Sequence, residues 1–122
     1  MLRDAKQDVQ IAFVQGGANE SRRAQEEAAK GLAVLTCIDS RIDPLAMLGL
    51  RAGDAKIIRN AGARVTDDAL RSLVLATNLL GATRLCVVQH TECAMVGSTE
   101  EEMRARISTA SGADASSWDF LV

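Results

Sequence analysis

Five residues near the ends of two apolar segments have the chemistry of a metal site. Cys37, Asp39 and Arg41 occupy alternate positions directly after one apolar run. His90, the only histidine in the chain, ends a second apolar run, and Cys93 follows three residues later. Two thiolates and one imidazole are sound zinc ligands, and three protein ligands with one open position are typical of a catalytic zinc site. We therefore predict that Cys37, His90 and Cys93 bind one Zn²⁺ ion per chain.

Asp39 and Arg41 are predicted to control what occupies the fourth position of the metal. In extended backbone, side chains two residues apart point the same way, so Asp39 lies beside Cys37. Its carboxylate can accept a hydrogen bond from a water molecule at that position, or it can take the position itself. The guanidinium of Arg41 has the fork geometry to hold the carboxylate away. The expectation is a switch in which the Asp39–Arg41 pair leaves the site open and Asp39 on the metal closes it.

Each of these residues also has a plainer interpretation. A cysteine at the end of a buried strand is often a small core residue, and that is our interpretation of Cys86, which lies mid-strand. A lone histidine is often packed or at the surface, and Asp39 with Arg41 could be a surface ion pair worth little. A loop after a strand could be no more than a strand exit, as at Arg59, Asn60 and Gly62. The placement of both motifs after apolar runs nevertheless favours a metal site.

The elements that must position these residues alternate between strands and helices. Short apolar runs with β-branched members predict buried strands at 32–36, 56–59 and 85–88. Capping residues and helical periodicity predict helices at 43–49 and 66–80, and a doubled capping box at 98–102 precedes a third at 103–107. This order predicts an α/β domain with a parallel sheet flanked by helices. Ligands bind beyond the carboxyl ends of such strands, where the two motifs would meet.

The segment 66–80 has the clearest helical pattern. Its large side chains form one apolar stripe at helical spacing, which two further leucines widen. We therefore expect this helix to be largely buried, through Leu70, Leu73, Val74, Thr77 and Leu80, with Leu75 and Leu79 beside them.

Length and composition limit the other possibilities. A chain of 122 residues is expected to form one domain, with a helical or extended N-terminal arm at 1–31, a core at 32–107, and a loop and apolar tail at 108–122. The net charge of −2 and the very low aromatic content, with one tryptophan, two phenylalanines and no tyrosine, argue against nucleic-acid binding. No apolar run is long enough for a membrane span, and no signal peptide is recognisable, so the expected location is the cytoplasm. Three cysteines without an export signal argue against a disulfide framework.

The combined motifs resemble the β-class carbonic anhydrases, particularly their compact bacterial members. The similarity runs from about residue 32 to residue 107 and is carried by four motifs, CIDSR at 37–41, IRNAG at 58–62, VTDDALRSL at 65–73 and HTEC at 90–93. The resemblance implies reversible hydration of carbon dioxide to bicarbonate and a proton. It assigns zinc binding to Cys37, His90 and Cys93 and a catalytic dyad to Asp39 and Arg41.

The resemblance also implies a pocket and an assembly. The loop at 60–62 lies close to the site in that family, so Asn60 and Gly62 are expected to line the substrate pocket. The family forms dimers or larger homo-oligomers with the N-terminal arm packed on the partner. Family members normally continue past the position of Val122, so we expect a form that lacks the usual C-terminal region, or a partner subunit that covers the strand edge at 85–89. Glu92 stands where aspartate is common.

Two other functions stay open at this point. One is hydrolysis of a carbon dioxide analogue, carbonyl sulfide or carbon disulfide, on the same zinc site. The other is a catalytically inactive subunit that holds zinc for a structural or sensing purpose.

Overall fold

The computed structural model describes residues 28–122 of the chain. These residues form two compact units, 28–93 and 94–122, and the sheet lies wholly in the first. Most of the predicted N-terminal arm at 1–31 therefore lies outside the described residues. The order of elements is strand, helix, strand, helix, strand, helix, which confirms the predicted α/β fold.

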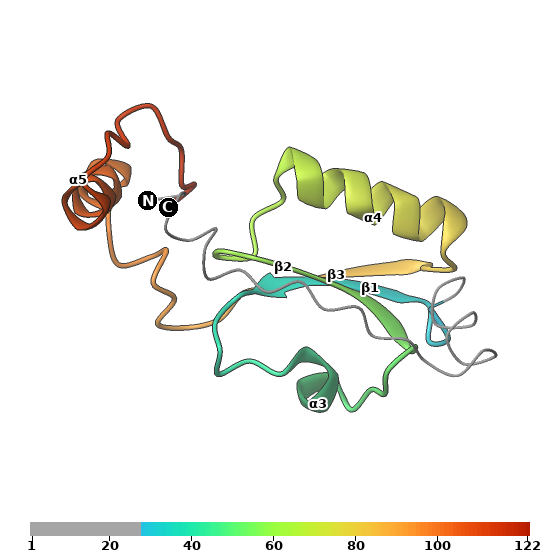
Figure 1. The fold of residues 1–122 in the computed structure, drawn as a ribbon. Helices are drawn as coiled ribbons and strands as arrows, with labels where there is room; N and C mark the ends of the chain where they lie inside the picture. Colours follow the sequence, from blue (N-terminus) through green and yellow to red (C-terminus); the bar gives the residue numbers. More distant parts are fainter. Residues whose placement is uncertain (1–27) are drawn as a thin grey trace. The chain divides into compact units, whose positions relative to one another are not determined.

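A parallel sheet of three strands is the centre of the first unit. Its middle strand is β1 (Leu32–Cys37), which pairs in parallel with β2 (Ala55–Asn60) on one side and β3 (Arg84–Val88) on the other. One helix lies on each face of this sheet, α4 on one and α3 on the other (Figure 1). Because β1 is covered on both faces and flanked on both edges, its central residues are fully buried, as at Ala33, Val34, Leu35 and Thr36.

The helices of this unit begin and end where the sequence predicts. The short helix α3 (Pro44–Leu48) is capped by Asp43, whose side chain accepts a hydrogen bond from Ala46 N–H, and it ends at Gly49 with a φ of 67°. Helix α4 (Asp67–Leu79) is capped by the hydroxyl of Thr66. These caps satisfy backbone donors that a helix cannot satisfy internally, and they fix where each strand-to-helix loop ends.

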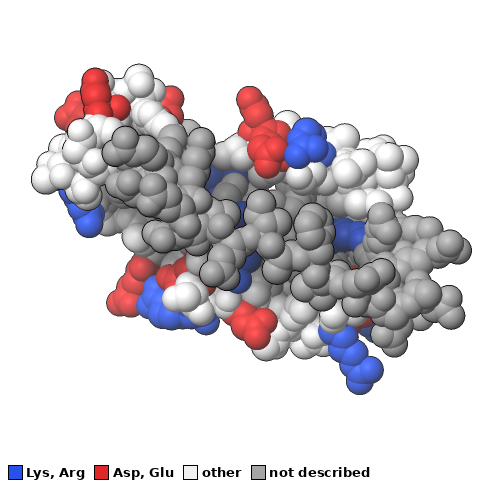
Figure 2. Space-filling model, in the orientation of Figure 1, with Lys and Arg blue, Asp and Glu red and all other residues white. Residues whose placement is uncertain are grey.

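The prediction that the helix at 66–80 is largely buried is wrong. The residues of α4 that face the sheet are mostly small, and they are Ala69, Leu73 and Ala76. A helix on one sheet face buries only one stripe, and alanines in that stripe let the two backbones approach closely. Most of the large apolar side chains point into solvent instead, and they are Leu70, Val74, Leu75 and Leu79. Figure 2 shows uncharged surface over α4 beyond its charged first turn.

The second unit contains one helix and an extended tail. Helix α5 (Glu100–Ser111) has the predicted capping box between Thr99 and Glu102. It continues past the expected end at 107, so the segment 108–111 is helical and not loop, because nothing breaks the helix before Gly112 with its φ of 71°. The tail at 118–122 packs back onto α5 through main-chain hydrogen bonds to Glu100 and Arg104.

None of the helices in the described part of the chain is long and apolar enough to cross a membrane.

Candidate metal centre

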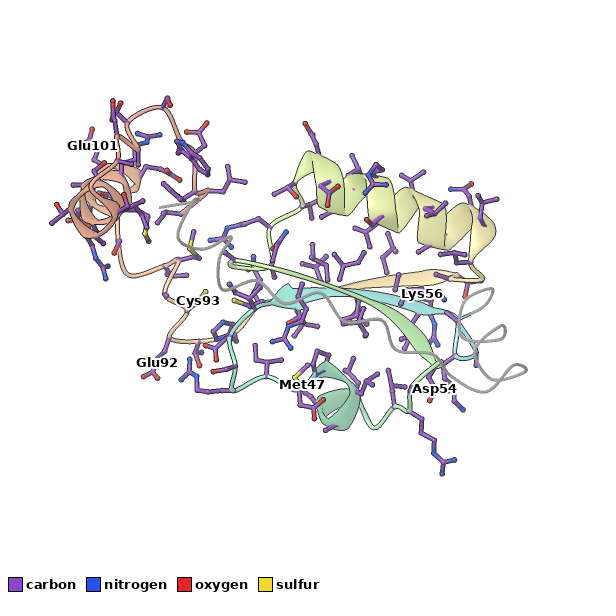
Figure 3. All side chains as sticks on the ribbon, viewed as in Figure 1. Met47, Asp54, Lys56, Glu92, Cys93 and Glu101 are labelled. Atoms are coloured by element: carbon purple, nitrogen blue, oxygen red, sulfur yellow. The ribbon has the colours of Figure 1, made fainter. Side chains whose placement is uncertain are left out.

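The carboxyl ends of β1 and β3 bring the three predicted ligands together. Cys37 is the last residue of β1, and His90 and Cys93 lie in the segment that follows β3. Because these strands are parallel neighbours, their ends meet at one edge of the sheet, where Figure 3 marks Cys93. The ligand atoms of Cys37, His90 and Cys93 all lie within 4.8 Å of one another. Cys37 and His90 are 53 residues apart in sequence, and the pairing of β1 with β3 brings them together.

The geometry of this cluster fits a tetrahedral metal ion. The Sγ atoms of Cys37 and Cys93 are 3.8 Å apart. Two sulfur ligands, each about 2.3 Å from a tetrahedral zinc ion, are expected about 3.8 Å apart. The three residues could therefore hold a metal ion without rearrangement of the two thiols.

His90 supplies a second observation in favour of a metal. Its Nδ1 atom lies 2.8 Å from the carbonyl oxygen of Thr91, which fixes the orientation of the ring. The other ring nitrogen, Nε2, is buried and has no hydrogen-bond partner among the described residues. A buried polar atom without a partner is costly and calls for an explanation. A metal ion coordinated by Nε2 removes that cost, and the contact at Nδ1 is the usual outer support of a ligating histidine.

Hydrogen bonds to the Cys37 thiol lower its pKa and so favour the thiolate. Burial raises the pKa of the Cys37 thiol, but hydrogen bonds, first among them the one from Gly62 N–H at 3.3 Å, outweigh it and lower the pKa to about 7. The thiolate is the form that binds metals. At neutral pH, Cys37 therefore loses its proton more readily than an ordinary cysteine.

Asp39 is held against Arg41 at the rim of the cluster. The Arg41 guanidinium donates to both carboxylate oxygens, with its Nη2 atom 2.7 Å from Oδ2, and the Arg41 main-chain N–H donates to Oδ1 at 2.8 Å. These hydrogen bonds hold the pKa of the Asp39 carboxyl far below its usual range. Oδ2 also lies 3.7 Å from Nε2 of His90. The structure thus has the paired arrangement that we expect of an open site, and the switch itself stays a prediction.

Arg41 also contacts the segment that carries the second thiol. Its Nη2 atom lies 3.4 Å from the carbonyl oxygen of Glu92, and its Nη1 atom lies 3.7 Å from the Glu92 carboxylate. Glu92 has a φ of 55°, and its side chain points away from the sheet (Figure 3). Arg41 therefore joins the loop after β1 to the loop after β3.

The two predicted pocket residues lie at the end of β2 and just after it, near Cys37. Asn60 is the last residue of the strand, where it pairs with Cys37, and Gly62 lies in the loop that follows. The Asn60 side chain closes this loop, because its Nδ2 atom donates to Arg64 C=O at 2.6 Å and its Oδ1 atom accepts from Arg64 N–H at 2.8 Å. Gly62 lies within the loop that these two hydrogen bonds close, and its N–H donates to Cys37 Sγ. The Asn60 side chain thus contacts Arg64 of the same loop, Gly62 contacts the Cys37 thiol, and the role of both residues in a substrate pocket stays a prediction.

Sequence reasoning missed one residue near the cluster. Arg59 donates hydrogen bonds to the main-chain carbonyls of Cys37 and Asp39, although the sequence offered it only as part of a strand exit. The available signal was an arginine directly after the apolar pair Ile57 and Ile58, near the end of a strand, where a charge needs a partner.

Comparisons with known proteins point to one family. Residues 32–113 match the family model described as carbonic anhydrase. Beta-carbonic anhydrase 1 of Mycobacterium tuberculosis is 39% identical over 84 residues, which are 69% of this chain and 52% of that protein. A carbon disulfide hydrolase of an Acidianus species is 50% identical over 72 residues, which are 59% of this chain and 35% of that protein.

A solved structure agrees with the sequence matches. The crystal structure of a carbonic anhydrase from Streptococcus mutans has a TM-score of 0.75 and 35% identity, and the match covers 98% of this chain and 67% of that one. The chain spans about half the length of the curated relatives it matches.

Proposed function

The chain belongs to the β-carbonic anhydrase family, and we propose that it catalyses the zinc-dependent, reversible hydration of carbon dioxide to bicarbonate and a proton. The observation that carries the proposal is the cluster of Cys37, His90 and Cys93 with the Asp39 carboxylate held at its rim. Three protein ligands and an open position suit hydration chemistry at neutral pH, and a carboxylate beside them can orient the water that takes that position.

The residues of the site have separate tasks in this proposal. Zinc bound by two thiolates and one imidazole would polarise a water molecule and lower the pKa of that water toward neutrality. His90 presents Nε2 in a fixed direction because Thr91 C=O holds Nδ1. Asp39 presents a hydrogen-bond acceptor beside the cluster and orients the water that donates to it. Arg41 keeps the carboxylate in that place and prevents it from taking the open position itself.

Hydrolysis of carbon disulfide is the second candidate function. It is favoured by the Acidianus protein named carbon disulfide hydrolase, which is 50% identical to this chain over the matched residues. Both reactions add water to a linear, electrophilic carbon, so the same metal ligands and the same Asp39–Arg41 pair would serve either substrate. Access to the site would decide between them.

The test of the proposed function is a comparison of both substrates on protein with one zinc per chain. We expect stopped-flow measurements between pH 7 and 9 to give a carbon dioxide hydration rate well above buffer. The release of hydrogen sulfide from carbon disulfide is expected to be slower than the hydration of carbon dioxide. A reversed preference would favour the second candidate. Stoichiometric zinc with neither activity would contradict both and favour an inactive zinc-binding subunit.

We further propose that the chain forms homodimers or larger homo-oligomers. The support is the outward face of α4, where large apolar side chains are exposed, including Val74 at 52% and Leu79 at 71%. Contiguous apolar surface of this kind is typical of a protein interface. A second copy of the chain is the expected occupant, because the face has no charged residue after Arg71.

A charge placed in this face is expected to dissociate the assembly. Light scattering after size exclusion should give the unmodified protein a mass of at least two 13.0-kDa chains. Val74→Asp should shift it to one chain, because a buried unpaired carboxylate is costly. Met47→Asp, an exposed apolar position on α3, is the control and should leave the mass unchanged. A monomeric unmodified protein, or a Val74→Asp variant of unchanged mass, would refute this assignment.

A further inference from the structure

We propose that Arg59 is a positioning residue that holds the metal ligand Cys37 and the carboxylate of Asp39 at a fixed separation by binding their main-chain carbonyls. The inference rests on the proposed metal site. It concerns a residue of a different strand, β2, which contributes no ligand of its own.

The Arg59 guanidinium spans the two residues whose side chains form the site. Its Nε atom donates to the carbonyl oxygen of Cys37 at 2.8 Å, and its Nη2 atom donates to the carbonyl oxygen of Asp39 at 2.8 Å. The donors of a guanidinium lie in one rigid plane at a fixed spacing. Two acceptors bound to the same plane are therefore held at a set distance from each other.

The two hydrogen bonds from Arg59, which we call the clamp, lie at the point where the pairing of β1 with β2 ends. The register pairs Cys37 with Asn60, and Ile38 N–H still donates to the carbonyl of Asn60 at 3.0 Å. Asp39 lies beyond this pairing, in the turn that leads toward α3. The Asp39 carbonyl has no main-chain donor from β2, and the Arg59 side chain supplies a donor instead. The segment after β1 is therefore bound to β2 for one residue beyond the sheet pairing.

The consequence is that two arginines hold Asp39 from opposite ends. Arg59 holds its main-chain carbonyl, and Arg41 holds its carboxylate. The same carbonyl also accepts Ile42 N–H at 3.0 Å, so the turn is closed as well. With the main chain fixed, only rotation of the Asp39 side chain can change its distance from the metal ligands. Without Arg59, the main chain that joins Cys37 to Asp39 can move too, and both residues lose their preset positions.

Removal of the clamp is expected to weaken zinc binding without unfolding the protein. Outer residues that orient metal ligands typically change metal affinity by about 10–100-fold when they are replaced. Arg59→Met keeps the unbranched apolar stem of the side chain and removes the guanidinium with its donors, and it should weaken zinc binding by an amount in that range. Arg59→Lys keeps one charged donor and should give an intermediate value. A purely structural role would instead lower the melting temperature and leave the affinity of the folded protein unchanged.

The matched control is Arg84→Met. Arg84 also donates from Nη2 to a main-chain carbonyl, that of Lys30 at 3.0 Å, and it lies at the start of β3, away from the ligands. Zinc affinity is measured by competition with a chromophoric chelator. We expect Arg84→Met to stay within about twofold of the unmodified protein. Equal loss in Arg59→Met and Arg84→Met, or no loss in Arg59→Met, would overturn the proposal.

Amide hydrogen exchange of the metal-free protein separates this inference from the proposed function. In Arg59→Met, the amides of Arg41 and Ile42 should exchange faster, because both bond to Asp39. The amides of 33–36 in β1 should keep their protection. Unchanged exchange at 41 and 42 would contradict the clamp. If Arg59→Met speeds exchange at 41 and 42 as expected, but the unmodified protein hydrates no carbon dioxide, only the proposed function is contradicted.

Discussion

Cys37→Ser is expected to make the protein lose its zinc on dialysis and, with the metal, its carbon dioxide hydration. Structural zinc sites with four ligands have apparent binding free energies of 10–16 kcal/mol, or roughly 3 kcal/mol per ligand. Loss of one thiolate should thus weaken zinc binding by about 100-fold or more. The fold should survive, because serine is nearly isosteric and the strand pairing of β1 does not involve the side chain. The hydration rate should fall to that of buffer.

Cys86→Ser is the matched control for this experiment. Cys86 is also a strand cysteine, but it lies in the middle of β3 and is not part of the ligand cluster. It should keep one zinc per chain and full activity. Zinc content by atomic emission after dialysis and the stopped-flow rate are measured on all three proteins. Stoichiometric zinc in Cys37→Ser, or equal loss in Cys86→Ser, would show that the metal is held elsewhere.

The sequence was sufficient to predict that Cys37, His90 and Cys93 lie together, because its signals are local. Each member of this cluster follows an apolar run that is long enough to be a strand, and parallel strands bring their carboxyl ends to one edge of the sheet. Capping residues have equally local effects, so Thr66 marked a helix start correctly. Of the doubled capping pattern at 98–102, the structure uses Thr99, and the helix begins at Glu100, earlier than the expected 103. Because the chain has a single histidine, His90 was the only candidate for an imidazole ligand.

What could not be predicted depends on which surfaces meet in three dimensions. The periodicity of α4 identified the apolar positions, but the face that packs on the sheet is set by small residues such as Ala69 and Ala76. Most of the leucines that were predicted to form a core stripe therefore point outward. Likewise, the contact of Arg59 with two carbonyls follows from the register of β1 against β2, which no short motif encodes.

Arg41→Ala is expected to reduce hydration by about 10–100-fold while zinc stays bound. In the structure, the Arg41 guanidinium takes both oxygens of the Asp39 carboxylate. Without it, the carboxylate lies beside the ligand cluster, 3.7 Å from Nε2 of His90, with no guanidinium to hold it back. Its pKa should rise toward the ordinary aspartate value of about 3.9, so it stays ionised at neutral pH. The free carboxylate can then take the open position, and the loss should persist from pH 6 to pH 8.

The zinc shell distinguishes this closed state from simple loss of a surface ion pair. X-ray absorption of Arg41→Ala should show two sulfur atoms, one nitrogen atom and a carboxylate oxygen. Arg71→Ala removes a comparable exposed pair, since Arg71 lies 3.0 Å from Asp68, and it should change neither the shell nor the rate. The double variant Arg41→Ala with Asp39→Asn should regain the open position but no activity, because an amide accepts a hydrogen bond more weakly than a carboxylate. An Arg41→Ala protein whose zinc carries water instead of carboxylate would refute the switch, since Arg41 would then not be what keeps Asp39 off the metal.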